Sequence, residues 1–507
     1  MFDNMRAGRR LVWLTCIGIL CGWAAGADAQ QTLGDYTDVR GMPTGYVGER
    51  ITELLDAVNS NDAEKVKSFV SKRFGPEFLN FAPMKGHLEV FAQVYRESRG
   101  LEFYSIRKYK EEKPKEEVVA ILRNKLTGGW QAFAMMIESA PPHRIMGLQF
   151  APARPPSDLA PAKAITEGEM GDALQAFVER LVEADAFSGT VLLAKDGKVL
   201  FKGAYGLASK RFNVPNKIDT KFNLGSMNKM FTGTAIARLI QLGKLSLDDP
   251  LSKFLSTDWM SHDITDKIKI KHLLTHTSGL GSYFNEAYMN SSKALFRELD
   301  DYEPLISKST LAFEPGTQWQ YSNTGMFLLG VVIEKVTGEN FFEHIRENIY
   351  KSAGMINSDC YDMDRPVPNL AIGYSPENGE GFNAWRNNLY QHVIRGGPAG
   401  GGFSTVEDLH RFAGALRQHK LLSEEYTEML WSPKPEFNSP NYGFGFSTHK
   451  SKSGERMVGH GGGFSGISAN LDIFLDSGYT AAVMSNYGGA ASLVADKIRE
   501  LIAASRK

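Results

Sequence analysis

Cysteine is scarce in this chain, and its scarcity limits how the fold can be held together. Only three of the 507 residues are cysteine: Cys16, Cys21 and Cys360. The first two lie in an apolar N-terminal stretch that we expect to be removed, which leaves Cys360 alone. The mature protein is therefore expected to contain no internal disulfide and to depend on its hydrophobic core.

The chain also lacks an excess of charge of either sign. It has 57 lysines and arginines against 58 aspartates and glutamates, a formal net charge of -1. This balance offers no long-range attraction for nucleic acid or for an anionic membrane. The 42% hydrophobic and 23% charged fractions are typical of a soluble globular protein rather than a disordered one.

The N-terminal apolar stretch is too short for an ordinary transmembrane helix. Residues 11–26, LVWLTCIGILCGWAAG, number 16, and a spanning helix needs ~20. Arginines precede the stretch and Ala27-Asp28-Ala29 follows it, an order typical of a secretory signal peptide; a signal anchor is the alternative. We expect residues 1–29 to be cleaved and the mature protein to be exported, to the periplasm or the cell exterior, without a membrane span.

Residues 45–150 have the pattern of a small domain in which helices precede strands. Apolar residues recur at helical spacing from Ile51 to Val58 and again from Val66 to Val70. Strand-like stretches separated by turns follow, over 101–109, 118–124, 130–138 and 143–150. This order predicts a small α+β accessory domain, similar in element order to the NTF2-like folds, and the sequence assigns no partner to it. A linker rich in proline and alanine is expected over 151–165.

The rest of the chain, 166–507, predicts a second α+β domain. An amphipathic helix over 173–182 is followed by two strands within 190–206, joined by the Asp196-Gly197 turn. Strands and a closing helix return near the C-terminus, whereas residues 225–430 have the pattern of helices and long loops. We expect an antiparallel sheet drawn from both ends of this region, flanked by helices, with a helical region inserted between its strands.

The pattern Ser-x-x-Lys occurs three times, and only its context separates the copies. Serine is a weak nucleophile that needs a neighbouring base, and residues three apart share a helix face but not a strand face. Ser105 and Ser447 lie in strand-like stretches, whereas Ser226 directly precedes a predicted helix over 230–243. Ser226 and Lys229 are therefore candidates for a nucleophile and its activator; a helix-capping serine with a solvated lysine is the alternative.

Tyr-x-Asn also occurs three times, at Tyr283, Tyr288 and Tyr321. The first two copies lie in a polar stretch that we expect to be a loop. The third lies between a Pro-Gly turn and an apolar helix, where the phenol can be presented with Asn323 beside it. An ordinary tyrosine at a helix boundary is the alternative.

A glycine-rich strand is the candidate for the third part of a site. His460-Gly461-Gly462 lies in a predicted strand, where glycines let a substrate approach the backbone and exposed N–H groups can bind a developing oxyanion. The competing Lys452-Ser453-Gly454 is charged and turn-like, and we expect it at the tip of the preceding hairpin.

Patterns that would indicate other chemistry are incomplete. His272 and His276 have the i, i+4 spacing of helical metal ligands, but no third ligand is evident. Residues 395–404 are rich in glycine but lack the Gly-Lys-Ser/Thr ending of a phosphate loop, and we expect a loop near the site there. The Gly-x-Ser-x-Gly of an α/β-hydrolase does not occur. No metal or organic cofactor is expected.

Three motifs in this order resemble one family. Ser226-x-x-Lys229, Tyr321-x-Asn323 and His460-x-Gly462 are similar to the motifs of the serine β-lactamase and DD-peptidase superfamily, in its class C β-lactamase-like branch. Flanking stretches agree with that branch, and together they cover about 185–500: LLTHTSGL (273–280), FEPGTQWQYSNTGMFLLG (313–330), GGFSTVEDL (401–409) and GHGGGFSG (459–466).

The resemblance implies a role for each motif. Ser226 would form an acyl-enzyme, and Lys229 and Tyr321 would share the proton transfers, with the choice of general base left open. Backbone N–H groups of Ser226 and Gly463 would hold the oxyanion. The substrate would be bound and oriented by the remaining motif residues, Asn323, His460 and Gly462.

One departure from the family pattern bears on the substrate. The β-lactamases and DD-peptidases usually carry Lys-Thr-Gly or Lys-Ser-Gly where His460-Gly461-Gly462 stands here, and that lysine and hydroxyl help to bind a carboxylate. A histidine is charged only part of the time near neutral pH, and Gly461 has no hydroxyl. We therefore expect hydrolysis of an ester or a D-amino-acid peptide. A true β-lactamase or DD-carboxypeptidase, or a non-catalytic penicillin-binding or sensor protein, is the alternative.

Overall fold

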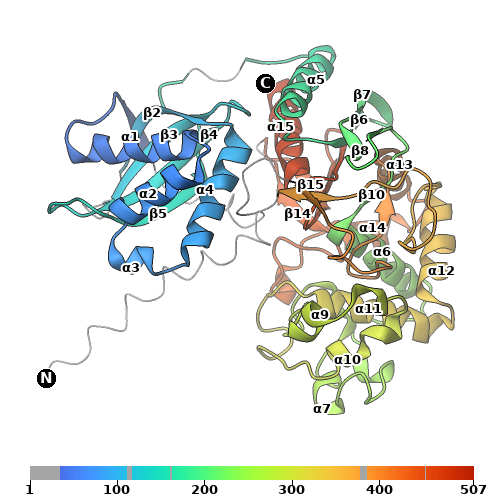
Figure 1. The fold of residues 1–507 in the computed structure, drawn as a ribbon. Coiled ribbons are helices and arrows are strands. Elements are labelled where there is room, and N and C mark those ends of the chain that lie inside the picture. Colours follow the sequence, from blue (N-terminus) through green and yellow to red (C-terminus); the bar gives the residue numbers. More distant parts are fainter. Residues whose placement is uncertain (1–34, 111–116, 160–162, 377–384, 452, 507) are drawn as a thin grey trace, which may run out of the picture. The chain divides into compact units, whose positions relative to one another are not determined.

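The computed structural model describes residues 35–110, 117–159, 163–376, 385–451 and 453–506 (Figure 1). These residues form two compact units. One is made of the described residues before 163 together with Pro376, and the other of 163–375 and 385–506. The expected signal peptide and Lys452 lie outside the described residues. Within the described ranges, no helix combines the length and the apolar character that crossing a membrane requires.

In the N-terminal unit, the helices precede all but the first strand of a five-stranded antiparallel sheet in the order of the sequence. Its helices are α1 (Tyr46–Asn59), α2 (Ala63–Arg73), α3 (Pro76–Leu79) and α4 (Met84–Ser98). Its strands lie in the sheet order β1 (Tyr36–Arg40), β2 (Leu101–Tyr109), β3 (Glu117–Asn124), β4 (Trp130–Ile137) and β5 (Ile145–Pro152). One hydrophobic core joins the apolar faces of the longer helices to β2 to β5. The similarity to NTF2-like folds stays a prediction.

Strand β1 was not predicted from the sequence. It is short and polar, YTDVR, and it pairs antiparallel with β2. Its Asp38 carboxylate is buried and receives two hydrogen bonds from the Arg107 guanidinium, at 3.0 and 3.1 Å. A strand held by a buried ion pair carries no alternation of apolar residues, so the periodicity gives no signal there.

The C-terminal unit is built on an antiparallel sheet drawn from both of its ends, as predicted. The strands lie in the order β14 (Ser447–Lys450), β15 (Arg456–Phe464), β16 (Ile467–Phe474), β17 (Tyr479–Ser485), β6 (Gly189–Lys195) and β7 (Lys198–Tyr205). Helices α5 (Glu167–Glu183) and α15 (Ala490–Ser505) pack side by side (Figure 1), and α15 covers β16 and β17. Helix α13 (Val406–Arg417) packs on β17 and β6.

Helices and loops fill the region between β7 and β14. The two long buried helices, α6 (Asn228–Gln241) and α11 (Asn323–Thr337), pack against each other. Shorter elements surround them: β8 (Leu207–Ser209), β9 (Val214–Pro215), β10 (Phe222–Asn223), α7 (His262–Thr265), α8 (Ile270–Leu274), α9 (Glu286–Asn290), α10 (Glu303–Ile306), α12 (Phe341–Ile345), β11 (Tyr374–Pro376), β12 (Trp385–Asn387), β13 (Phe403–Ser404) and α14 (Glu424–Trp431). A single large core joins this region to the sheet. The predicted fold class, α+β with an inserted helical region, is confirmed.

Candidate active site

Ser226 lies in a tight turn that leads directly into a buried helix. The turn is one 3-10 turn, Gly225–Met227, and α6 begins at Asn228. Gly225 has a φ of +50°, and a Cβ atom there would come within 2.7 Å of the Gly463 nitrogen. The position before the serine therefore requires glycine, because it combines a left-handed backbone with close approach to β15.

The competing copies of the two short motifs have structural explanations. Ser105 lies in β2 and Ser447 in β14, as predicted, so the lysine three residues later faces the opposite side of the sheet. The expected loop is present at Tyr283, whereas Tyr288 lies in α9 (Glu286–Asn290). Both rings are buried in an aromatic cluster with Tyr302 and Phe327, which gives them a packing role.

Lys229 lies one helical turn after Ser226, and its side chain is fully buried. The Nζ atom donates to the Ala399 carbonyl oxygen at 2.6 Å and to Asn323 Oδ1 at 2.9 Å. It also lies 4.8 Å from the centre of the Tyr321 ring. Burial lowers the pKa of this amine well below its ordinary value of 10.5, because removing the ammonium from water penalises the charged form. A neutral amine has two N–H donors, and with both used its lone pair is left free to accept a proton.

Tyr321 and Asn323 are positioned by the start of α11. Ser322 is the N-cap of that helix: its Oγ accepts from Gly325 N–H at 2.8 Å and donates to the Gly281 carbonyl at 2.9 Å. The Asn323 amide accepts from Lys229 through Oδ1 and donates through Nδ2 to Ser282 Oγ at 3.2 Å. The capped helix end thus brings Tyr321, Asn323 and Lys229 together.

His276 belongs to this arrangement, although its role was not predicted. Its Nδ1 accepts the Ser322 backbone N–H at 3.1 Å, and its ring lies 4.5 Å from the rings of both Tyr321 and Tyr442. Burial holds its pKa well below 6.5, so the ring stays neutral and Nδ1 remains an acceptor. His272 Nδ1 likewise accepts the Lys269 N–H at 3.2 Å. One feature of the sequence could have indicated this role. The histidine stands among small, hydroxyl-bearing residues in THTSG, where the packing of a helix face does not explain an imidazole.

Replacing His276 is expected to weaken catalysis through Tyr321. In His276→Ala the Ser322 N–H loses its acceptor and the Tyr321 ring loses a packing partner. We expect the loss of transition-state stabilisation to be about 1–3 kcal/mol, which lowers kcat/KM by roughly 5- to 150-fold. His276→Asn keeps an acceptor near the Nδ1 position and tolerates the φ of +61° at this residue, so it should retain most of the activity. Steady-state kinetics on one ester would compare them, and equal losses in both variants would contradict this role.

His460 faces the interior, which corrects one expectation. It is 7% exposed; its Nδ1 lies against the Gly461 carbonyl oxygen and its Nε2 lies 3.0 Å from Tyr442 Oη. Because a carbonyl only accepts, Nδ1 carries the proton and Nε2 accepts from the tyrosine. Burial lowers the pKa of His460 to about 3. The expectation of a partly charged histidine near neutral pH is therefore wrong.

The glycines after His460 let β15 cross the Ser226 turn at close range. A Cβ atom on Gly462 would come within 1.8 Å of the Leu224 carbonyl oxygen and 3.1 Å of the Ser226 nitrogen. Because Gly225 meets the Gly463 nitrogen in the same way, the backbone nitrogens of Ser226 and Gly463 both lie at this crossing. No residue with a Cβ atom fits at position 462 unless the turn moves.

Hydrogen bonds hold the glycine-rich loop at 396–402 against the start of α6. Asn228 donates to the Gly397 carbonyl and accepts from Gly402 N–H, both at 3.1 Å, and Thr232 Oγ1 donates to the Pro398 carbonyl at 2.8 Å. These bonds fix the neighbouring Ala399 carbonyl that accepts from Lys229. The expectation of a loop near the site is confirmed.

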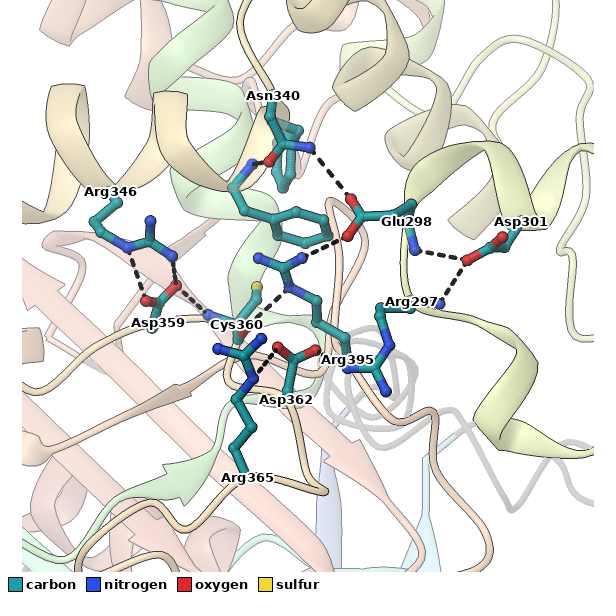
Figure 2. A network of polar contacts seen from close by, with 12 residues as sticks. Arg297, Glu298, Asp301, Asn340, Arg346, Asp359, Cys360, Asp362, Arg365 and Arg395 are labelled. Atoms are coloured by element: carbon teal, nitrogen blue, oxygen red, sulfur yellow. Dashed lines mark hydrogen bonds and ion pairs between the residues drawn. The ribbon is translucent and has the colours of Figure 1, made fainter.

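A polar network anchors the residue before this loop (Figure 2). Arg395 donates to Glu298 Oε1 at 2.9 Å and to the Cys360 carbonyl at 3.3 Å, and its guanidinium lies 3.5 Å from the centre of the Phe342 ring. The buried Cys360 side chain in turn accepts from Asn228 Nδ2 at 3.4 Å, and burial raises the pKa of its thiol to about 12. The thiol is therefore protonated and serves packing.

The C-terminal unit is similar to known proteins. The family model described as Beta-lactamase matches residues 174–505. Penicillin-binding protein 4* of Bacillus subtilis (strain 168) is 31% identical over 325 residues, which are 62% of this chain and 71% of that protein. The crystal structure of a penicillin binding protein from Bacillus halodurans is similar with a TM-score of 0.59 and 32% identity, over 64% of this chain and 98% of the other.

A solved hydrolase is also similar. A D-stereospecific amidohydrolase from Streptomyces sp. is 27% identical with a TM-score of 0.53, over 66% of this chain and 98% of its own. The family match covers more than half of the chain and includes each of the three motifs brought together above. The chain therefore belongs to the Beta-lactamase family, and its fold is that of the family's serine hydrolases.

Proposed function

We propose that the protein is an exported hydrolase that cleaves a carboxylic ester or a D-amino-acid amide or peptide through an acyl-enzyme on Ser226. The observation that carries the proposal is the state of Lys229. Its amine is buried one helical turn from Ser226, its Nζ atom donates to two protein oxygens, and its pKa is lowered by burial. A solvated lysine beside a capping serine would have none of these properties.

The reaction would proceed in two steps. Ser226 Oγ attacks the carbonyl carbon while its proton passes to Lys229 or Tyr321, which share the proton transfers. The oxygen that becomes negative is held by the backbone N–H groups of Ser226 and Gly463. The leaving group takes a proton and departs, and water then hydrolyses the acyl-enzyme by the same route. Asn323 holds the amine of Lys229 and orients the substrate.

The neutral His460 favours substrates without a carboxylate at this point. A lysine there could pair with a carboxylate, but a buried imidazole whose two nitrogens both have partners cannot. The similar Streptomyces protein is named an amidohydrolase of D stereospecificity, which agrees with an amide or peptide substrate. True β-lactamase or DD-carboxypeptidase activity is therefore placed second, and a non-catalytic penicillin-binding role third.

A panel of chromogenic substrates tests this order. We expect kcat/KM for p-nitrophenyl butyrate and for D-alanine p-nitroanilide to exceed kcat/KM for a chromogenic cephalosporin by about 10- to 100-fold, the value of one lost charged hydrogen bond. A fluorophosphonate probe followed by peptide mass spectrometry should label the peptide that contains Ser226. Faster turnover of the cephalosporin would reverse the order, and labelling elsewhere would remove Ser226 from the chemistry.

A further inference from the structure

Two aromatic side chains lie together where β15 leaves the Ser226 turn. Phe464 ends β15, and its ring stacks against that of Phe284 with the centroids 6.1 Å apart and the planes inclined by 27°. Each of the two residues is 39% exposed. Large apolar side chains are normally buried, so an exposed pair beside a reaction centre indicates a surface with a use.

Phe464 projects from the side of β15 that faces the Ser226 turn. Alternate residues of a strand share one face, so positions 462 and 464 point the same way. The Cβ direction of Gly462 is toward the Leu224 carbonyl and the Ser226 nitrogen. The Phe464 side chain therefore leaves the strand two residues further along the same face.

Phe284 is tied to the reaction centre by hydrogen bonds. Its backbone N–H donates to Ser282 Oγ at 3.3 Å, and the same oxygen accepts from Asn323, which accepts from Lys229. The Phe284 ring also packs on the rings of Tyr283 and Tyr288, at 4.6 and 4.8 Å. Since those two tyrosines are buried, the exposed part of Phe284 is the part that they leave uncovered.

Two amino groups near this pair, those of Lys229 and Lys293, are engaged by protein oxygens. Lys229 donates inward, to Ala399 and Asn323, and the ammonium of Lys293 donates to the backbone carbonyls of Tyr288 and Ser291. Both amino groups thus donate to protein oxygens rather than to the exposed faces of the two rings.

We propose that Phe284 and Phe464 form a subsite that binds an uncharged apolar group of the substrate, an alkyl chain or an aryl ring attached to the acyl carbon. The inference rests on the proposed function and narrows its substrate class. Each methylene that the rings cover should raise kcat/KM by about two- to fourfold.

The test is a series of p-nitrophenyl esters: acetate, butyrate, hexanoate and hemisuccinate. In the wild type the hexanoate/acetate ratio of kcat/KM should be at least about tenfold. Butyrate should exceed hemisuccinate, which has a carboxylate in place of the terminal methyl, by about tenfold or more. Phe284→Ala and Phe464→Ala should each bring the hexanoate/acetate ratio close to one, and Phe464→Leu should keep most of it. These ratios do not depend on the fraction of folded enzyme.

A matched control is Phe212→Ala, which removes a phenylalanine that is 69% exposed in the turn between β8 and β9; its ratio should equal that of the wild type. An unchanged ratio in both alanine variants, or a preference for hemisuccinate, would overturn the subsite while Ser226-dependent turnover left the proposed function standing. If no ester in the series, hydrophobic or charged, were hydrolysed and the fluorophosphonate probe left Ser226 unlabelled, the proposed function itself would be wrong, and the subsite with it.

Discussion

Ser226→Ala is expected to lower kcat/KM for a short-chain ester by roughly 10⁴- to 10⁶-fold, because it removes the atom that forms the acyl-enzyme. The fold should be unaffected. Ser226 is only partly buried in its turn, and the geometry of that turn depends on Gly225 and Gly462 rather than on the hydroxyl. The measurements are steady-state kinetics together with the far-UV circular dichroism spectrum and melting temperature of both proteins.

The matched control for this change is Ser447→Ala. Ser447 begins the same Ser-x-x-Lys pattern but lies in β14, so its replacement should leave kcat/KM within about threefold of the wild type. Equal activity in Ser226→Ala and the wild type would show that the hydrolysis proceeds without this serine.

Lys229→Met should reduce kcat/KM by about 10³-fold or more, because methionine fills most of the same space without supplying a proton acceptor. The wild type should lose activity as the pH falls through the lowered pKa of Lys229, since protonation removes the free lone pair. The variant should lack that acid limb in its pH–rate profile. Lys244→Met, at an exposed lysine just after α6, should behave as the wild type.

Lys229→Met should also change how the free energy of unfolding depends on pH. Burial lowers the pKa of Lys229 in the folded chain below the 10.5 of a free lysine. Between those two values the unfolded state binds more protons, so this group makes the free energy of unfolding rise with pH. The free energy of unfolding of the wild type minus that of Lys229→Met should increase as the pH rises toward 10.5, and then level off. Chemical denaturation at several pH values would measure it, and a constant difference would mean that Lys229 has an ordinary pKa.

The positions of the candidate residues could be inferred from the sequence because their contexts differ in periodicity. Ser105 and Ser447 lie in alternating stretches, whereas Ser226 precedes a helical one, and the structure has strands and helix accordingly. The Asp196-Gly197 turn likewise joins β6 to β7. Local patterns of this kind report on the chain's own neighbours, and they were sufficient to place the sheet strands of the C-terminal unit.

What the sequence did not reveal depends on contacts between distant segments. His276 supports Tyr321 from 45 positions away, and the Ala399 carbonyl meets Lys229 across 170 positions. The burial of His460, which sets its charge, results from its packing against Tyr442. Strand β1 is stabilised by the buried pair Asp38–Arg107 rather than by apolar alternation. None of these contacts leaves a local pattern that periodicity can detect.

The protonation state of Lys229 is the property on which the proposed chemistry depends most directly. NMR of the protein with ¹³Cε-labelled lysine would follow each side chain through a pH titration, and the resonance missing from Lys229→Met would identify this one. We expect that resonance to titrate well below 10.5. Titration of every lysine near 10.5, with Lys229 among them, would contradict a neutral amine acting beside Ser226.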